Sequence, residues 1–126
     1  MNKQIKNTSA APAPIGPYSQ AVKAAGLLFI SGQIALKPGT SELIIDNIQD
    51  ETEMVMQNLK AILETSGLGF ANVIKTTIFL KDMELFAPVN EIYGKFFESD
   101  FPARETVSVK GLPKNVNVEI SMIASE

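Results

Sequence analysis

The order in which strand-like and helix-like segments follow one another constrains the fold of this chain most strongly. Segments with apolar residues at every second position alternate with two segments whose apolar residues recur at helical spacing. Two strand–helix–strand connections predict both helices on one face of a mixed sheet, and therefore an α+β fold in the order β-β-α-β-α-β-β. The predicted strands are residues 18–24, 27–33, 73–80, 104–110 and 116–124.

Local signals place the ends of the two predicted helices. Asp46, with Gln49 three residues later, resembles a capping box before the first helix, and Gly67 marks its end. Pro88 suits the first position of the second helix, where its missing N–H costs no hydrogen bond. The stripes predicted to be buried are Ile48, Thr52, Val55, Leu59 and Ile62 in the first helix, and Val89, Ile92, Phe96 and Phe97 in the second.

The N-terminal residues differ in composition from the rest of the chain. Residues 1–16 are rich in Ala, Pro, Ser and Asn and predict an extended lead-in, so ordered structure is expected from about Tyr18. All 126 residues are predicted to form one domain, because this length is enough to bury a core. The start lacks an apolar leader and the apolar run 24–30 is too short to span a bilayer, so a cytoplasmic protein without membrane contact is expected.

Period-two alternation sorts the strand residues into two faces. The face predicted to lie under the helices holds Leu28, Ile30, Ile74, Ile78, Val107, Val109, Val118 and Ile120. The opposite face holds Phe29, Ser31, Gln33, Lys75, Thr77, Phe79, Arg104, Thr106, Ser108, Asn117, Glu119, Ser121 and Ile123. This mixture suits a subunit interface that contains a polar cleft. A single bulge would invert the assignment of its strand.

Missing residue types exclude several chemistries. The chain has no His and no Cys, so it holds no Ser-His-Asp triad, no thiol nucleophile, no iron–sulfur cluster and no ordinary structural zinc site. The acidic residues are scattered without the spacing of a calcium loop, and we predict no metal. With 11 basic against 14 acidic residues and no basic stretch, nucleic acid is not an expected partner.

Arg104 and Glu119 are the candidate catalytic residues. Arg104 is the only arginine among 11 basic residues, and a guanidinium grips a carboxylate through two parallel hydrogen bonds as lysine cannot. It is either the anchor of a small anionic ligand or half of a structural ion pair, with Glu119 or with an acid on a neighbouring chain. Glu119 interrupts an apolar strand. It is either solvated or, if it shares a face and a cleft with Arg104, a general base that polarises water.

Gly32 and two hydroxyl side chains are candidates for ligand contacts. A glycine inside the strand at Ser31–Gln33 marks a turn, a bulge or the close approach of a ligand to the main chain. The hydroxyls of Tyr18 and Ser31 lie on predicted strands, where such a residue, taken alone, is more often part of the packing or of the strand ladder.

Six short segments between about residue 11 and the C-terminus form a pattern. They are residues 15–22 (IGPYSQAV), 30–34 (ISGQI), 73–82 (VIKTTIFLKD), 86–93 (FAPVNEIY), 101–104 (FPAR) and 112–120 (LPKNVNVEI). In this order they resemble the RidA (YjgF) family of reactive-intermediate deaminases. The resemblance implies a chorismate-mutase-like fold and a homotrimer with active sites between neighbouring subunits.

The resemblance also implies a reaction that uses no cofactor. Members of the family hydrolyse 2-imino acids, such as 2-iminopropanoate and 2-iminobutanoate, to 2-oxo acids and ammonia. These imines form from enamines that pyridoxal-phosphate-dependent dehydratases release. By resemblance, Arg104 would hold the substrate carboxylate and Glu119 would orient the attacking water. The other implied substrate contacts are Tyr18, Ser31, Gly32, Asn90 and the main chain of Thr106.

This sequence departs from the common family pattern after Arg104. Glu105 and Thr106 stand where many relatives carry a small pair such as Ser-Cys. A second carboxylate beside Arg104 would weaken its hold on an anion, but alternation predicts that Glu105 points to the opposite face.

Two other functions compete with deamination. A non-catalytic trimeric module would bind small carboxylates such as 2-oxo acids in the same cleft, and it predicts saturable binding without turnover. Ribonuclease activity, attached to some relatives, is disfavoured by the net charge of −3 and the absence of histidine.

Overall fold

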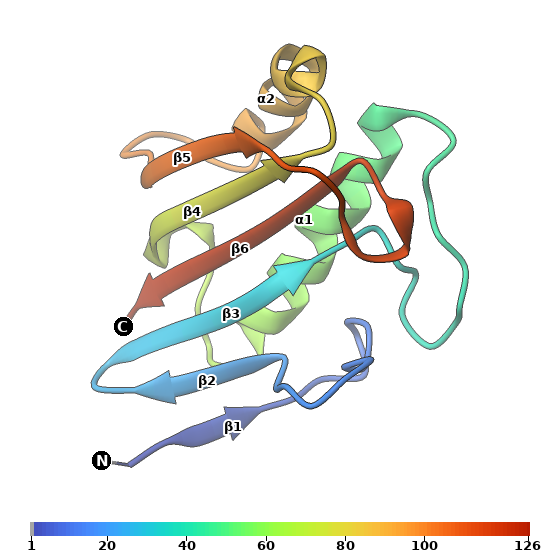
Figure 1. Ribbon diagram of the computed structural model, residues 1–126. Helices are drawn as coiled ribbons and strands as arrows, with labels where there is room; N and C mark the ends of the chain where they lie inside the picture. Colours follow the sequence, from blue (N-terminus) through green and yellow to red (C-terminus); the bar gives the residue numbers. More distant parts are fainter. Residues whose placement is uncertain (1) are drawn as a thin grey trace.

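A computed structural model describes residues 2–126 as one six-stranded sheet with two α-helices (Figure 1). The strands are β1 (Gln4–Lys6), β2 (Ala21–Ala24), β3 (Leu27–Gln33), β4 (Val73–Leu80), β5 (Ala103–Ser108) and β6 (Val118–Ser125). Their order in the sheet is β1-β2-β3-β6-β4-β5, with β4 and β5 parallel and all other pairs antiparallel. The helices are α1 (Ile48–Glu64) and α2 (Phe86–Gly94).

Both helices cover the same face of the sheet, as predicted (Figure 1). The core between them is formed by fully buried side chains of α1, such as Val55, Leu59 and Ile62, against Ile78 of β4 and Ile120 of β6. The α+β class and the mixed sheet are therefore confirmed. Among residues 2–126, neither helix combines the length and the apolar composition that a membrane crossing needs.

The N-terminal lead-in is more ordered than predicted. Residues 4–6 form an additional strand, β1, which pairs with β2. Strand β2 begins at Ala21 and not at Tyr18, because the chain turns at Gly16, where the Tyr18 N–H donates to the Gly16 carbonyl over 2.8 Å. The turn at Ala25 and Gly26 is confirmed, with φ values of 55° and 78°.

The start of α1 is shifted by one residue from the predicted cap. Asn47, and not Asp46, caps the helix: its Oδ1 accepts the Asp50 N–H over 2.8 Å. The end at Gly67 is confirmed. Gly67 has a φ of 69°, and the Leu68 N–H donates to the Leu63 carbonyl across it, as in a Schellman motif.

The second helix begins earlier than predicted. Its first residue is Phe86, so Pro88 occupies the third helical position and not the first. Proline is accommodated there because the N–H groups of the first turn have no partner within the helix. A short 3-10 turn at Met83–Leu85 leads into it, capped by Asp82.

The predicted faces of β4 and β5 are partly wrong. A bulge between Val73 and Lys75 leaves Ile74 48% exposed, although alternation placed it under the helices. Beyond the bulge, Thr76, Ile78 and Leu80 are fully buried against the helices. Their partners on β5 are Arg104, Thr106 and Ser108. These three residues therefore lie on the helix side of the sheet, whereas Val107 lies on the other side and is exposed.

A buried carboxylate joins α1 to the start of β6. Glu51 is fully buried in the first turn of α1. It accepts the main-chain N–H groups of Asn117 and Val118 over 2.8 Å and 3.2 Å, and the Asn117 side-chain amide over 2.7 Å. These three bonds hold the residues that immediately precede Glu119.

Replacing Glu51 with alanine should lower the free energy of unfolding by roughly 3 kcal/mol, because it leaves buried N–H donors without an acceptor. Urea denaturation at matched protein concentration measures the change. Glu53→Ala is the matched control, since Glu53 is exposed on the same helix, and its effect should stay within about 0.5 kcal/mol. Equal losses in the two variants would contradict the stabilising role of Glu51.

Candidate functional site

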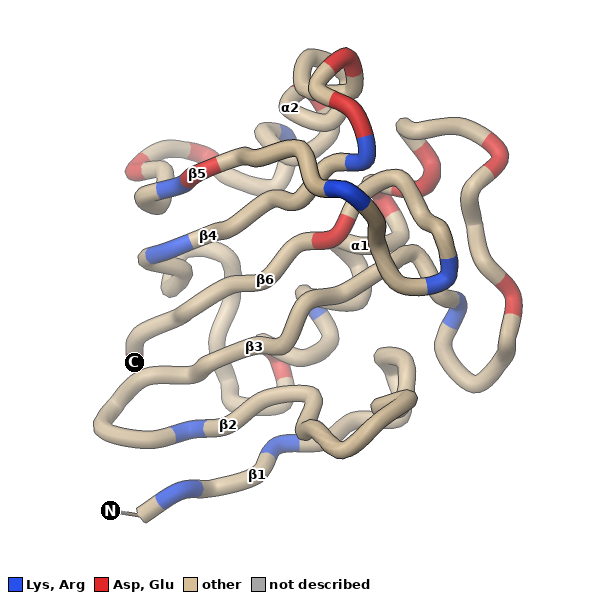
Figure 2. The backbone as a smooth tube through the Cα atoms, in the orientation of Figure 1, with Lys and Arg blue, Asp and Glu red and all other residues tan. Residues whose placement is uncertain are grey.

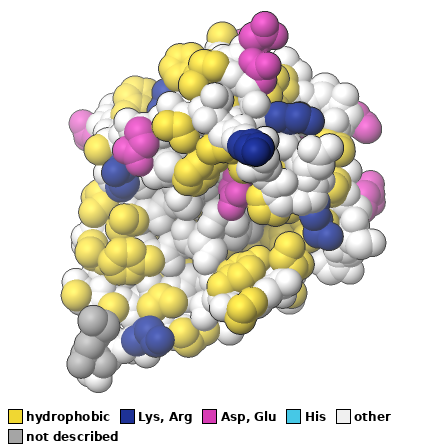
Figure 3. Space-filling view, viewed as in Figure 1, with side chains coloured by type: hydrophobic (Ala, Val, Ile, Leu, Met, Phe, Trp, Pro, Cys, Tyr) yellow, Lys and Arg dark blue, Asp and Glu magenta, His cyan; other side chains and the backbone are white. Residues whose placement is uncertain are grey.

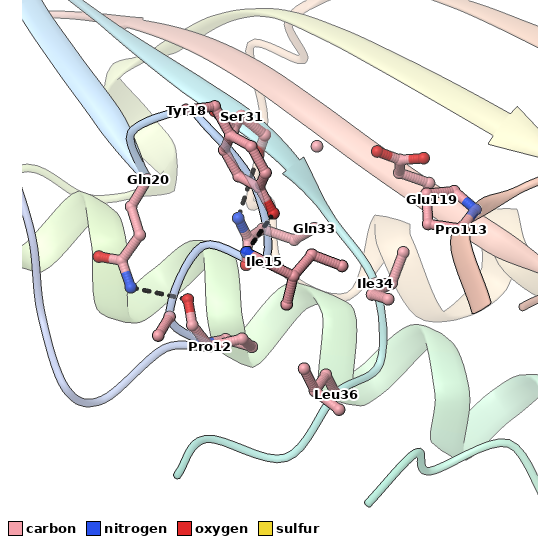
Figure 4. A pocket seen from close by; sticks show the side chains of 12 residues that line it. Pro12, Ile15, Tyr18, Gln20, Ser31, Gln33, Ile34, Leu36, Pro113 and Glu119 are labelled. Atoms are coloured by element: carbon pink, nitrogen blue, oxygen red, sulfur yellow. Dashed lines mark hydrogen bonds between the residues drawn. The ribbon is translucent and has the colours of Figure 1, made fainter. Parts of the chain in front are cut away.

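A cavity of about 330 Å³ lies between the N-terminal segment, β3 and the start of β6 (Figure 4). Its lining contains four of the predicted site residues: Tyr18, Ser31, Gly32 and Glu119. The remaining lining residues are Pro12, Ala13, Ile15, Gln20, Gln33, Ile34, Leu36 and Pro113. Segments that are far apart in the sequence therefore meet at one site.

Gly32 allows the Glu119 carboxylate to lie against the main chain of β3. The pairing of β3 with β6 shifts between Ile30 and Gln33, which is the bulge that the glycine indicated. A Cβ atom on Gly32 would overlap Oε2 of Glu119 and lie 2.8 Å from its Cδ. The close approach at this glycine is therefore that of the Glu119 side chain.

The Glu119 carboxylate lines this cavity without a hydrogen-bond partner among the described residues. Within residues 2–126 it accepts no hydrogen bond and forms no ion pair. Burial raises its pKa above the ordinary value of 4.5. By contrast, the Ser31 hydroxyl donates to the Ser19 carbonyl over 2.6 Å, and Tyr18 Oη accepts the Ile15 N–H over 3.2 Å. A partly buried carboxylate without partners can accept a proton from a bound water.

A second cavity, of about 340 Å³, contains Arg104. Asn90, the remaining predicted side chain, lines it together with Tyr93, Gly94, Phe101 and Pro102. The guanidinium carbon of Arg104 lies 5.2 Å from the ring centre of Tyr93 and 5.7 Å from that of Phe86. Arg104 is thus packed against aromatic rings of α2.

Arg104 has no carboxylate partner in the described part of the chain. The ion pairs there join Lys23 to Glu126, and Lys75 to Glu105 over 3.2 Å. The interpretation of Arg104 as half of an ion pair with Glu119 is therefore excluded within one chain. An arginine with aromatic packing and no acidic partner keeps its charge and its hydrogen-bond donors for an external anion.

Tyr93 and Phe86 are the site residues that the sequence reasoning missed. The Tyr93 hydroxyl and Thr76 Oγ1 form a buried hydrogen bond of 3.0 Å, and burial raises the pKa of Tyr93. The signal was available, because Phe86, Asn90 and Tyr93 recur at i, i+4 and i+7 on one helix face. This spacing looks the same whether the residues fill a core or support a site.

Arg104 and Glu119 do not meet within one chain. Arg104 pairs with Thr76, whose side chain faces the helices, whereas Glu119 pairs with Phe79 on the open face. The prediction of a shared face was therefore wrong, because the parallel register pairs Arg104 with Thr76 on the helix side and leaves Val107 on the open face. Thr106 lines neither cavity, and its Oγ1 is buried without a hydrogen-bond partner among the described residues.

Glu105 points away from Arg104, as alternation predicted. Its carboxylate accepts a hydrogen bond of 2.8 Å from Thr77 and pairs with Lys75 on the open face. The bond from Thr77, and then the interaction with Lys75, hold its pKa below the ordinary value. Glu105 therefore does not compete with an anion for Arg104.

In the described part of the chain, the charged residues form no further cluster that suggests a site. Figure 2 shows Lys and Arg spaced singly along the backbone. Within residues 2–126, no group of three or more acidic residues is arranged to hold a metal ion. The groups available for chemistry are therefore the Arg104 guanidinium on the helix side of the sheet and the Glu119 carboxylate on the open face.

Comparisons with known proteins agree on one family. Residues 8–126 match the family described as endoribonuclease L-PSP. The chain is 50% identical over 122 residues to the RutC family protein PH0854 of Pyrococcus horikoshii, covering 97% of each chain. It is 44% identical to a 2-iminobutanoate/2-iminopropanoate deaminase of Dermatophagoides farinae, covering 96% of this chain and 94% of the relative.

Solved structures show the same fold. The protein YyfA of the Rid family from Yersinia pestis superposes with a TM-score of 0.96 at 41% identity, covering 99% of this chain and 100% of that one. TdcF of E. coli with bound serine superposes with a TM-score of 0.93 at 40% identity, covering 98% of each chain.

Proposed function

This chain belongs to the RidA (YjgF) family, and we propose from that membership that it is a deaminase of 2-imino acids. Its substrates would include 2-iminopropanoate and 2-iminobutanoate, and its products a 2-oxo acid and ammonia. One observation carries the proposal: a guanidinium and a carboxylate each line a cavity without any partner of opposite charge among residues 2–126. The deaminase name of the Dermatophagoides relative and the serine bound to TdcF support a small amino-acid-like substrate.

Because Arg104 and Glu119 lie on opposite faces of one sheet, the proposed site combines Arg104 of one copy with Glu119 of another. A homotrimer with three such sites is the proposed assembly. The open face of the sheet supports it: Figure 3 shows hydrophobic side chains gathered over the strands on the side away from α1. Phe29 and Val107 on this face are 44% and 41% exposed. A sheet face that exposes large apolar side chains among polar ones suits burial against a further copy.

In the proposed reaction, Arg104 binds the substrate carboxylate through two parallel hydrogen bonds and so places the iminium carbon beside Glu119. Glu119 accepts a proton from water as the water oxygen bonds to that carbon and the C=N electron pair moves to nitrogen. Glu119 then passes the proton to the nitrogen. The C–N bond breaks, the hydroxyl loses its proton, and a 2-oxo acid and ammonium leave. An iminium carbon is already a strong electrophile, so the step uses no covalent nucleophile.

The other predicted contacts remain proposals with different support. Tyr18, Ser31 and Gly32 share the cavity of Glu119, and Asn90 shares that of Arg104. The Thr106 side chain lines neither cavity, so we propose a contact through its main-chain carbonyl on the edge strand β5.

The direct test couples a serine or threonine dehydratase to this protein and follows the appearance of 2-oxo acid. We expect the wild-type protein to accelerate release of 2-oxo acid over the spontaneous rate, in proportion to its concentration. Saturable binding of a 2-oxo acid by calorimetry, without acceleration, would instead establish a non-catalytic binding module.

The aromatic contacts of Arg104 predict an effect on affinity. Tyr93→Leu should raise KM roughly two- to thirtyfold and change kcat little, because a guanidinium–aromatic contact contributes about 0.5–2 kcal/mol. Tyr93→Phe keeps the ring and is the matched control, so its KM should stay close to wild type. If the two variants raise KM equally, the hydrogen bond to Thr76 and not the ring supports Arg104.

A further inference from the structure

The cavity of Glu119 has a polar end and an apolar end. Glu119 and Gly32 lie at the polar end. The apolar end is formed by Pro12, Ile15, Ile34 and Leu36, which Figure 4 shows in its lower part; Ile15 lies beside Tyr18, whose hydroxyl accepts its N–H. We call these four residues the apolar recess.

The polar groups around the recess are occupied within the chain. The Gln33 side-chain amide donates to the Ser31 carbonyl over 3.2 Å. The Gln20 amide donates to the carbonyls of Ala11 and Pro12 over 3.3 Å and 2.8 Å, so it is directed into the wall and not into the cavity. A ligand group that enters the recess therefore meets mainly aliphatic surface.

Two buried amides hold the walls of the recess in place. Gln20, 2% exposed, binds the N-terminal segment and also exchanges two hydrogen bonds with the main chain of Thr8 over 2.8 Å and 3.0 Å. Asn58 of α1, fully buried, donates to the carbonyls of Ile34 and Leu36 over 3.1 Å and 3.0 Å. The recess is therefore preformed, and a ligand does not have to order it on binding.

The cavity is larger than the smallest imino acids require. 2-Iminopropanoate has six non-hydrogen atoms, which at roughly 30 Å³ for each water-sized group occupy about half of the cavity of about 330 Å³. Its carboxylate would lie toward Arg104 of a second copy and its imine carbon beside Glu119, so its methyl group leaves the recess unfilled.

We infer that the apolar recess binds the side chain of the substrate, and that this protein prefers 2-imino acids with aliphatic side chains of three or four carbons to 2-iminopropanoate. The inference rests on the proposed function and names the substrate class of the same site. Each methylene that moves from water into such a surface should raise kcat/KM about fourfold.

A series of imines tests this preference. An L-amino-acid oxidase generates them in place from alanine, 2-aminobutyrate, norvaline and leucine, and kcat/KM is measured for each against its spontaneous hydrolysis. We expect kcat/KM to rise along the unbranched series in the wild-type protein. Ile15→Ala should flatten this rise without unfolding the chain, because Ile15 is 58% exposed. Ile45→Ala is the matched control: Ile45 is 39% exposed and lies outside the cavity lining.

The outcomes separate the inference from the proposed function. A rise that Ile15→Ala flattens and Ile45→Ala preserves supports the recess. Turnover of 2-iminopropanoate with a flat or falling series overturns the inference and leaves the proposed function standing. A rise that persists in Ile15→Ala also overturns it, because the preference would then arise elsewhere. No turnover of any imine overturns both.

Discussion

Replacing Glu119 with glutamine should lower kcat for imine hydrolysis by about 10²- to 10⁴-fold, which is the usual contribution of a positioned general base. The amide keeps the size of the side chain but cannot accept a proton from water. Glu119 forms no hydrogen bond or ion pair among residues 2–126, so the isosteric substitution removes no polar interaction that stabilises the fold. Glu91→Gln, on the exposed side of α2, is the matched control and should leave kcat unchanged.

The pH dependence of kcat provides a second test of the role of Glu119. Burial raises the pKa of Glu119, so its reactive, deprotonated form is lost as pH falls through a value above 4.5. The acidic limb of kcat should therefore have its midpoint above 4.5, and Glu119→Gln should remove this limb from the residual activity. A limb that survives in Glu119→Gln would assign the titration to another group.

Gly32→Ala should reproduce the loss of kcat seen in Glu119→Gln, although the Glu119 side chain itself is unchanged. The new Cβ would occupy the place of the carboxylate, which must then rotate away from β3. The obstructing atoms belong to a side chain, so we expect the variant to fold, with unchanged circular dichroism and a kcat close to that of Glu119→Gln. Full activity in Gly32→Ala would show that catalysis does not require the position of Glu119 seen here.

Mixing two inactive variants should restore activity, because each proposed site takes Arg104 from one copy and Glu119 from another. Arg104→Ala and Glu119→Gln should each be nearly inactive alone. When the two are refolded together in equal amounts, about one site in four regains both groups, since each group has an even chance of being intact. The expected gain is at least tenfold over either variant. The coupled dehydratase assay measures it.

Two controls define this experiment. Mixing the variants without unfolding should restore nothing until subunits exchange, and refolding either variant alone should restore nothing at all. Light scattering on each preparation establishes whether the assembly is a trimer. If refolded mixtures stay inactive although mixed trimers form, both groups must come from the same copy, and the composite site would be wrong.

Local sequence patterns were sufficient to predict most of the helices, strands and turns. The stripe of α1, the end at Gly67 and the turn at Ala25 and Gly26 were predicted correctly, because spacing within one segment decides them. The predicted cap of α1 was displaced by one residue, since Asp46 and Asn47 are both good caps and only the backbone geometry selects Asn47. Strand β1 was missed because three residues carry little periodicity, and its partner β2 stabilises it.

The sequence by itself determined which groups are available for chemistry: a chain without His or Cys, a single arginine, and a glutamate within an apolar strand. It also determined the alternation of strands and helices that defines the fold class. Only the tertiary structure decided that Arg104 and Glu119 lie on opposite faces, and that Gly32 makes room for the Glu119 carboxylate. The physical reason is that alternation within β5 does not say which of its two faces the helices cover; the parallel register with β4 decides this and places Arg104, and not Val107, on the helix side.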